Sequence, residues 1–290
     1  MIKNRKGFTE QPAPKTFEGM SQYRPALCFE LTGKTLELVM DTGFDYELTF
    51  KDRKVLTCGE KGKEAAEYEY DCLKVDDDTY FVNFEVTGAS PRAGQTFVLD
   101  MEQYLVTANY CTVGQNPRWP KMCKPHITFG AIRKEDGTLN PLRHGFTDEM
   151  VGRAIHWQYG NLEVVHVYAS ERYYRLTQTR EGLERLRTEK PDVYERLSKR
   201  NTVTIYEEPC NMIKIKDGIY VFECNEEMAN RERGAGNDLF FLMNLNRMYD
   251  VGRSFGYNDK GLPENYTYGA FGEYYDASEL LARDSTEFIR

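Results

Sequence analysis

An internal duplication is the feature that most constrains the fold of this chain. The segment EYEYDCLKVDDDTYFVNFE at 67–85 returns in altered form as EEPCNMIKIKDGIYVFECN at 207–225. The shared positions are Lys74 and Tyr80 in the first copy and Lys214 and Tyr220 in the second. A period this long does not fit a solenoid, whose repeating units are far shorter. The duplication therefore predicts two domains of the same type.

Other segments follow the same order in both copies. Gly33 returns as Gly152, the turn at Gly43 returns as Gly160, and the aromatic stretch that ends at Gly114 returns at 238–252. Because the order of the segments is kept, and not only their composition, we interpret each copy as a complete domain.

Both copies alternate apolar and polar side chains with a period of two. Leu36, Leu38 and Met40 alternate with other side chains before a tight turn at Gly43, and the alternation resumes over 44–50. This pattern predicts a β-hairpin. About seven or eight such strands in each copy predict a small closed barrel, since closure removes the exposed edges of a sheet. We predict an all-β fold of two tandem antiparallel β-barrels with short helical insertions.

The domain organisation follows from these patterns. We expect an N-terminal extension at 1–24, a first barrel at 25–115, a linker at 116–148, a second barrel at 149–275 and a C-terminal tail at 276–290. The insertion REGLERLRTEKPDVYERLSKR at 180–200 has apolar residues at helical spacing, and Pro191 is typical of the first turn of a second helix. Its charged face is either solvated or part of a lid over a barrel mouth. The tail also predicts a short helix, with Asp276 or Ser278 as its cap.

Composition excludes some partners. The net charge is −8, and such a surface argues against nucleic acid and anionic membranes, which attract basic proteins. We find no apolar run long enough for a transmembrane helix and no secretory signal, so we expect a cytoplasmic protein.

Cysteine and histidine spacing gives no metal motif. The seven Cys include no CxxC pair, and the four His are scattered. We therefore expect mostly buried, reduced thiols, no cofactor and no tightly bound metal.

Two stretches carry a family resemblance. GKTLELVMDTGFDYELTF at 33–50 resembles the opening hairpin of phenolic acid decarboxylases, and 67–85 is similar to a later strand and turn of that family. Two such barrels in tandem resemble the MoaF family, over roughly residues 25–275. The resemblance implies calycin-like, or lipocalin-like, barrels. The MoaF name is connected with molybdenum-cofactor annotation and with a monoamine-utilisation operon, and neither connection assigns a reaction.

The decarboxylases use a Tyr pair on the first strand, an Arg on the third and a Glu on the fourth. In the first copy only Glu69 matches. In the second copy Tyr159 matches one Tyr, Trp157 replaces the other, Arg175 matches the Arg and Glu208 the Glu, with Glu207 as the alternative. The residues expected to bind a ligand there are Trp157, Tyr159, His166, Tyr174, Arg175 and Glu207, and those expected to be catalytic are Glu208, Arg175 and Tyr159.

Each of these residues also has a structural interpretation. Arg175 can form an ion pair with Glu207 or Glu208 on the neighbouring strand, and Trp157 and His166 can be core residues. Three functions stay open at this point. The first is binding of an aromatic, phenolic or amine-derived metabolite in a barrel. The second is a cofactor-independent lyase or isomerase that uses Arg175 and Glu208. The third is a structural protein with filled barrels, and a homodimer is compatible with all three.

Overall fold

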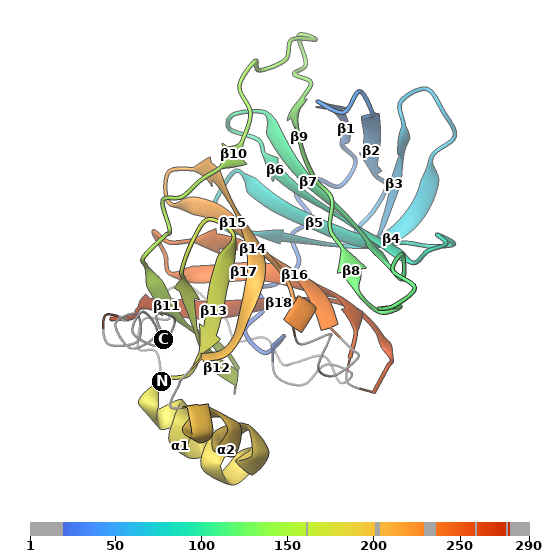
Figure 1. Cartoon of the computed structure of the whole chain (residues 1–290). Helices are drawn as coiled ribbons and strands as arrows, with labels where there is room; N and C mark the ends of the chain where they lie inside the picture. The colour runs from blue at the N-terminus through green and yellow to red at the C-terminus, as the bar shows by residue number, and fades with distance from the viewer. Residues whose placement is uncertain are drawn as a thin grey trace.

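The computed structural model describes residues 20–160, 162–200, 204–228, 236–258, 260–276 and 278. Most of the expected N-terminal extension and most of the expected tail helix lie outside these residues. The described chain folds into two β-barrels that pack side by side, coloured blue to green and green to red in Figure 1.

The first barrel closes with eight antiparallel strands. They are β1 (Thr35–Met40), β2 (Asp45–Phe50), β3 (Val55–Glu60), β4 (Ala66–Lys74), β5 (Thr79–Val86), β6 (Ala93–Asp100), β7 (Leu105–Val113) and β9 (Ile127–Ile132). Each strand pairs with the next, and β9 pairs with both β7 and β1, which closes the barrel. The short β8 (Cys123–Lys124) extends the sheet beside β7.

The second barrel repeats this arrangement. Its strands are β11 (Ala154–Tyr159), β12 (Leu162–Tyr168), β13 (Tyr173–Thr177), β14 (Thr204–Lys216), β15 (Ile219–Asn225), β16 (Gly236–Asn244), β17 (Tyr249–Tyr257) and β18 (Pro263–Tyr274). β18 pairs with β17 and β11, as β9 pairs with β7 and β1, and β10 (Gly145–Phe146) adds to β14. The prediction of two tandem antiparallel barrels is confirmed.

One expected boundary is wrong. β9 lies within 116–148, which we expected to be a linker, and without it the first barrel would stay open between β1 and β7. The Pro, Lys and Gly residues around β9 hid a strand of only six residues, Ile127–Ile132.

The duplicated residues have duplicated contacts. Lys74 pairs with Tyr80 across β4 and β5, and Lys214 pairs with Tyr220 across β14 and β15. In the first barrel both side chains bind one carboxylate, Glu30, with Nζ–Oε2 and Oη–Oε2 distances of 2.7 and 2.8 Å. The corresponding carboxylate in the second barrel comes from Glu149, at 2.9 and 2.5 Å.

The last repeated stretch is aligned differently from our expectation. Tyr104 and Met248 are the two non-glycine residues with positive φ, 56° and 51°, among the described residues. Each ends the turn before the seventh strand of its barrel. The equivalent of Gly252 therefore lies inside β7, at Ala108, and not at Gly114.

The two barrels share a buried interface. The outer faces of β4–β6 pack against those of β14–β18, and their apolar side chains form one cluster. The cluster consists of Tyr23, Leu73, Val75, Phe81, Val98, Ile213, Ile215, Ile219, Val221, Phe240, Leu242, Tyr249, Val251 and Phe271. This shared core holds the barrels in a fixed relation, because separating them would expose it to water.

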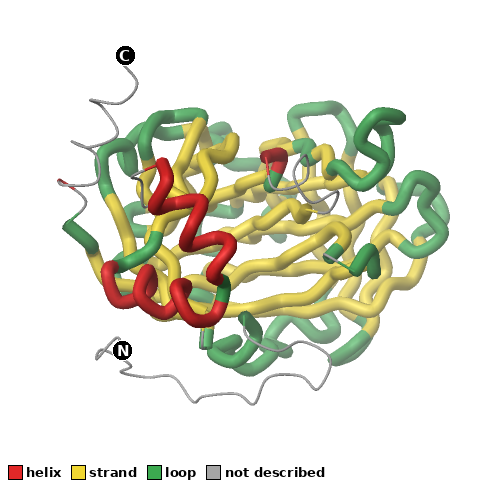
Figure 2. The backbone as a smooth tube through the Cα atoms, turned by 60° about the horizontal axis from the view of Figure 1, so that its bottom comes forward, coloured by secondary structure: helices red, strands yellow, loops and turns green. Residues whose placement is uncertain are grey.

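The predicted insertion is helical. α1 (Arg180–Glu189) and α2 (Pro191–Arg200) connect β13 to β14 and lie at one end of the second barrel (Figures 1 and 2). Thr179 caps α1 by accepting a hydrogen bond from the Gly182 amide, and Arg185 forms an ion pair with Glu163 of β12 at 3.1 Å. No helix among the described residues is long and apolar enough to cross a membrane.

Candidate functional site

Four of the predicted site residues meet inside the second barrel. Trp157 and Tyr159 on β11 share the inward face, as the alternation predicts, and Tyr174 on β13 lies in the same buried cluster. The ring of His166 on β12 lies 5.2 Å from that of Tyr174 and 5.8 Å from that of Phe241. The sequence therefore identifies one lumen and a large part of its aromatic wall.

Arg175 and Glu207 lie elsewhere. They face each other across β13 and β14 on the outer wall, with a distance of 2.8 Å from Arg175 Nε to Glu207 Oε2. Glu208, the next residue, turns inward beside Tyr174, is 1% exposed, and accepts a hydrogen bond from the Met228 amide at 2.7 Å.

The expected catalytic pair is therefore not assembled. Arg175 lies opposite Glu207 on the outer wall, and consecutive residues of a strand point to opposite faces, so Glu208 faces the lumen. Arg175 and Glu208 therefore cannot contact the same guest in the lumen. The ion pair with Glu207 is the structural alternative that the sequence left open for Arg175. In the first barrel, Glu69 is exposed.

A different acid faces the lumen. Asp250 on β17 accepts a hydrogen bond from the Tyr159 hydroxyl, with an Oη–Oδ2 distance of 2.9 Å. Burial raises the pKa of this carboxyl well above its usual range, because a charged carboxylate would lose its hydration there. The sequence signal was the alternation in YDVGRSF, in which Asp250 occupies the opposite face from Tyr249 and Val251.

Several polar atoms of the lumen have no partner among the described residues. They are His166 Nδ1, Asp250 Oδ1, Tyr268 Oη and Trp157 Nε1, which lies beside the Tyr168 hydroxyl without a well-aligned hydrogen bond. Burial lowers the pKa of His166 to about 3, so its ring is neutral. Buried polar groups are nearly always hydrogen-bonded in native proteins, so we expect water or a bound small molecule to form hydrogen bonds with these atoms.

Two glycines position the aromatic wall. A Cβ at Gly272 would come within 2.6 Å of the Trp157 ring, and a Cβ at Gly252 would come equally close to the Tyr268 ring. Trp157 pairs with Gly272 and Tyr268 with Gly252 across adjacent strands. Each ring therefore lies over a neighbouring strand that has no side chain at that point.

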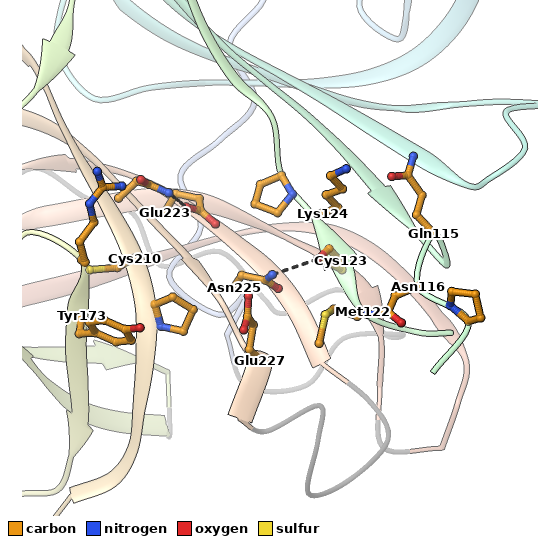
Figure 3. A pocket seen from close by; sticks show the side chains of 15 residues that line it. Gln115, Asn116, Met122, Cys123, Lys124, Tyr173, Cys210, Glu223, Asn225 and Glu227 are labelled. Atoms are coloured by element: carbon orange, nitrogen blue, oxygen red, sulfur yellow. Dashed lines mark hydrogen bonds between the residues drawn. The ribbon is translucent and has the colours of Figure 1, made fainter. Parts of the chain in front are cut away.

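A hollow lies outside the barrels. A groove of about 720 Å³ runs between the segment 115–125 of the first barrel and β13–β15 of the second (Figure 3). Polar side chains of its wall already bind other protein groups. The Asn225 side-chain amide donates to the Cys123 carbonyl at 2.9 Å, and the Asn211 side-chain amide donates to Glu223 at 2.6 Å. The groove is therefore large enough for a ligand, but the two amides of its wall named here already have partners. The lumen has polar atoms without a partner among the described residues.

Glu223, which lines this groove, belongs to a buried acid pair with Asp238. Glu223 is 1% exposed, and burial and the neighbouring Asp238 raise its pKa well above the usual range. Among the described residues neither Glu223 Oε1 nor Asp238 Oδ1 has a donor, and a proton on Glu223 would supply one between them. Asp238 in turn is paired with Arg253, whose Nη2 lies 2.7 Å from Asp238 Oδ2.

We expect Glu223→Gln to stabilise the protein at neutral pH. Glutamine has the shape of the protonated acid, donates to Asp238 and accepts from Asn211. The raised pKa means that the contribution of Glu223 to stability is complete below the ordinary value of 4.5 and is lost as pH rises toward the folded-state pKa. The variant should match the parent in acid and exceed it on the order of 1 kcal/mol at neutral pH.

Urea unfolding across a pH series measures this difference. The matched control is Glu171→Gln on the exposed surface, where no difference is expected. A loss of stability in Glu223→Gln at neutral pH would show that Glu223 is ionised in the folded protein.

The sequence matches one family model. Residues 15–114 match the model described as the MoaF N-terminal domain. This match covers the first barrel except β9. A search of the curated proteins found no match to the sequence.

Proposed function

As a member of the MoaF family, the chain is a barrel protein, and we propose that it binds a small, uncharged aromatic molecule in the lumen of its second barrel. The observation that carries the proposal is the set of unpartnered polar atoms on the aromatic wall, His166 Nδ1, Asp250 Oδ1 and Tyr268 Oη. A flat guest with a hydroxyl group can stack on the rings and satisfy these atoms. Eight-stranded barrels are wide enough to hold one small ligand when side chains do not fill them.

The charges of the lumen support a neutral guest. His166 is uncharged, the Asp250 carboxyl has a raised pKa, and Arg175 is on the outer wall. A carboxylate moved from water to such a site without a cationic partner would lose several kcal/mol of hydration. A phenol loses much less, and its hydroxyl both donates and accepts.

Intrinsic fluorescence tests the proposal. The chain has two Trp, and Trp119 lies in the segment between β7 and β8, so Trp119→Phe leaves Trp157 as the only indole. We expect p-cresol, a neutral phenol, to change the emission of Trp157 with saturation and to raise the melting temperature. We expect 4-hydroxyphenylacetate, its anionic counterpart at neutral pH, to bind at least about tenfold more weakly.

Two variants make the test specific. Tyr268→Phe removes one unpartnered hydroxyl and should weaken p-cresol binding by about fivefold, the effect of one hydrogen bond. Tyr274→Phe, on the same strand but 56% exposed, should leave the binding unchanged. If neither probe alters the emission or the melting temperature, the lumen is a filled core and the proposal is wrong.

A further inference from the structure

Two cysteines meet where the chain enters the first barrel. The Cys28 amide donates to the Cys72 carbonyl of β4 at 2.8 Å, and the Cys28 side chain packs against the buried cluster that contains Cys72. Cys28 is partly exposed, whereas Cys72 is buried. Residues joined by such a backbone bond have their Cα atoms within the range that a disulfide spans.

The surroundings of Cys28 favour its thiolate. The ammonium group of Lys74 lies near Cys28 and binds the Glu30 carboxylate at 2.7 Å. Hydrogen bonding from the Cys72 thiol and the Glu30 amide, together with the charge of Lys74, outweighs burial and the charge of the Glu30 carboxylate and lowers the pKa of Cys28 to about 7. A substantial fraction of Cys28 is therefore a nucleophilic thiolate at neutral pH.

The second barrel shows that the fold does not need these thiols. There the Thr147 amide donates to the Met212 carbonyl at 3.0 Å, in the same relation to Glu149 and Lys214 as Cys28 and Cys72 have to Glu30 and Lys74. The same backbone contact forms with a hydroxyl and a thioether in place of two thiols. The backbone contact shared by the two barrels therefore does not require the cysteine pair, which points to a chemical role for the two thiols.

We propose that Cys28 and Cys72 form a dithiol site that reduces a hydroperoxide and closes to a disulfide. The Cys28 thiolate attacks the outer peroxide oxygen, the O–O bond breaks, and the sulfur becomes a sulfenic acid as an alcohol or water leaves. The Cys72 thiol then attacks the Cys28 sulfur, the S–O bond breaks, and water leaves as the S–S bond forms. The peroxide is reduced by two electrons, which the two thiols supply.

The other cysteines lack this combination of exposure and activation. Burial raises the pKa of Cys58 and of Cys210 to about 12, and it raises the pKa of Cys111 and Cys224 well above the usual range. Cys111 also contacts Cys123 through its sulfur, but both are buried. Cys111 and Cys123 are therefore an internal control, because their sulfur atoms are close together but both are shielded from solvent and from a peroxide.

Thiol counting by mass spectrometry tests the proposal. The reduced full-length protein is treated with hydrogen peroxide, quenched, unfolded and alkylated with N-ethylmaleimide. We expect two fewer alkylated cysteines than the seven of the reduced chain, and a digest should contain a peptide pair that joins Cys28 to Cys72. The oxidised protein should also melt at a higher temperature, since the bond restricts the unfolded chain.

Variants that copy the second barrel separate the two steps. Cys28→Thr should keep its six remaining thiols after peroxide treatment, whereas Cys72→Met should stop at the sulfenic acid, which dimedone traps at Cys28. The matched control Cys111→Ser should still lose two thiols. Full alkylation of the treated parent, or a disulfide located at Cys111 and Cys123, would overturn the proposal.

Discussion

Replacing Arg253 by methionine should lower the free energy of unfolding by about 3–5 kcal/mol, the usual effect of removing one partner of a buried ion pair. Arg253 and Asp238 are both 0% exposed, at the interface between the barrels. Methionine fills part of the volume of the side chain but leaves the Asp238 carboxylate beside Glu223 without a cation. Equilibrium unfolding in urea measures the loss.

The same barrel offers a matched control. Arg175 and Glu207 form an ion pair of almost the same length, 2.8 Å, but on the outer wall, where Glu207 is 38% exposed. Arg175→Met should therefore change the stability by less than about 1 kcal/mol. The double variant Arg253→Met with Asp238→Asn should recover part of the loss, because no carboxylate remains unpaired. Equal losses for Arg253→Met and Arg175→Met would show that burial does not govern these pairs.

Short-range periodicity was sufficient to predict two β-barrels and which residues of β11 face the lumen. Alternation placed Trp157 and Tyr159 on one face, and the duplication predicted two barrels before any contact was known. The same rule applied more strictly would have separated Tyr174 from Arg175 and Glu207 from Glu208. Consecutive residues of a strand cannot both face the lumen. A site that contains both Tyr174 and Arg175, or both Glu207 and Glu208, is therefore inconsistent with the predicted strands.

What the sequence could not give depends on contacts between distant strands. Asp250 joins the site only because β18 pairs with both β11 and β17, which brings its carboxyl within 2.9 Å of the Tyr159 hydroxyl. The pairing of Asp238 with Arg253 and Glu223, and that of Cys28 with Cys72, likewise need the closed barrels to exist. Closure of the first barrel itself depends on β9, which has the same six residues as β1 and β2 in length but lies in a segment whose prolines and glycines are typical of a linker.

The close approach of the Trp157 ring to β18 leads to the second large effect, which we expect from Gly272→Val. A Cβ at this position would lie 2.6 Å from Trp157 Cζ3, well inside van der Waals contact, and valine adds two methyl groups to it. The buried ring cannot move away without displacing its neighbours in the lumen, so the variant should lose about 3 kcal/mol of stability.

Two further variants identify the cause of this loss. Gly145→Val is the control, because a Cβ on that strand residue would meet no atom within 4 Å. Trp157→Leu removes the ring, so the loss caused by Gly272→Val should be much smaller in a Trp157→Leu background than in the parent. A double-mutant cycle measured by urea unfolding gives this coupling directly. If the two losses are additive, Gly272→Val acts through the backbone of β18 and not through contact with the Trp157 ring. Strong coupling would show that the glycine makes room for the indole ring, which forms part of the aromatic wall of the proposed ligand site.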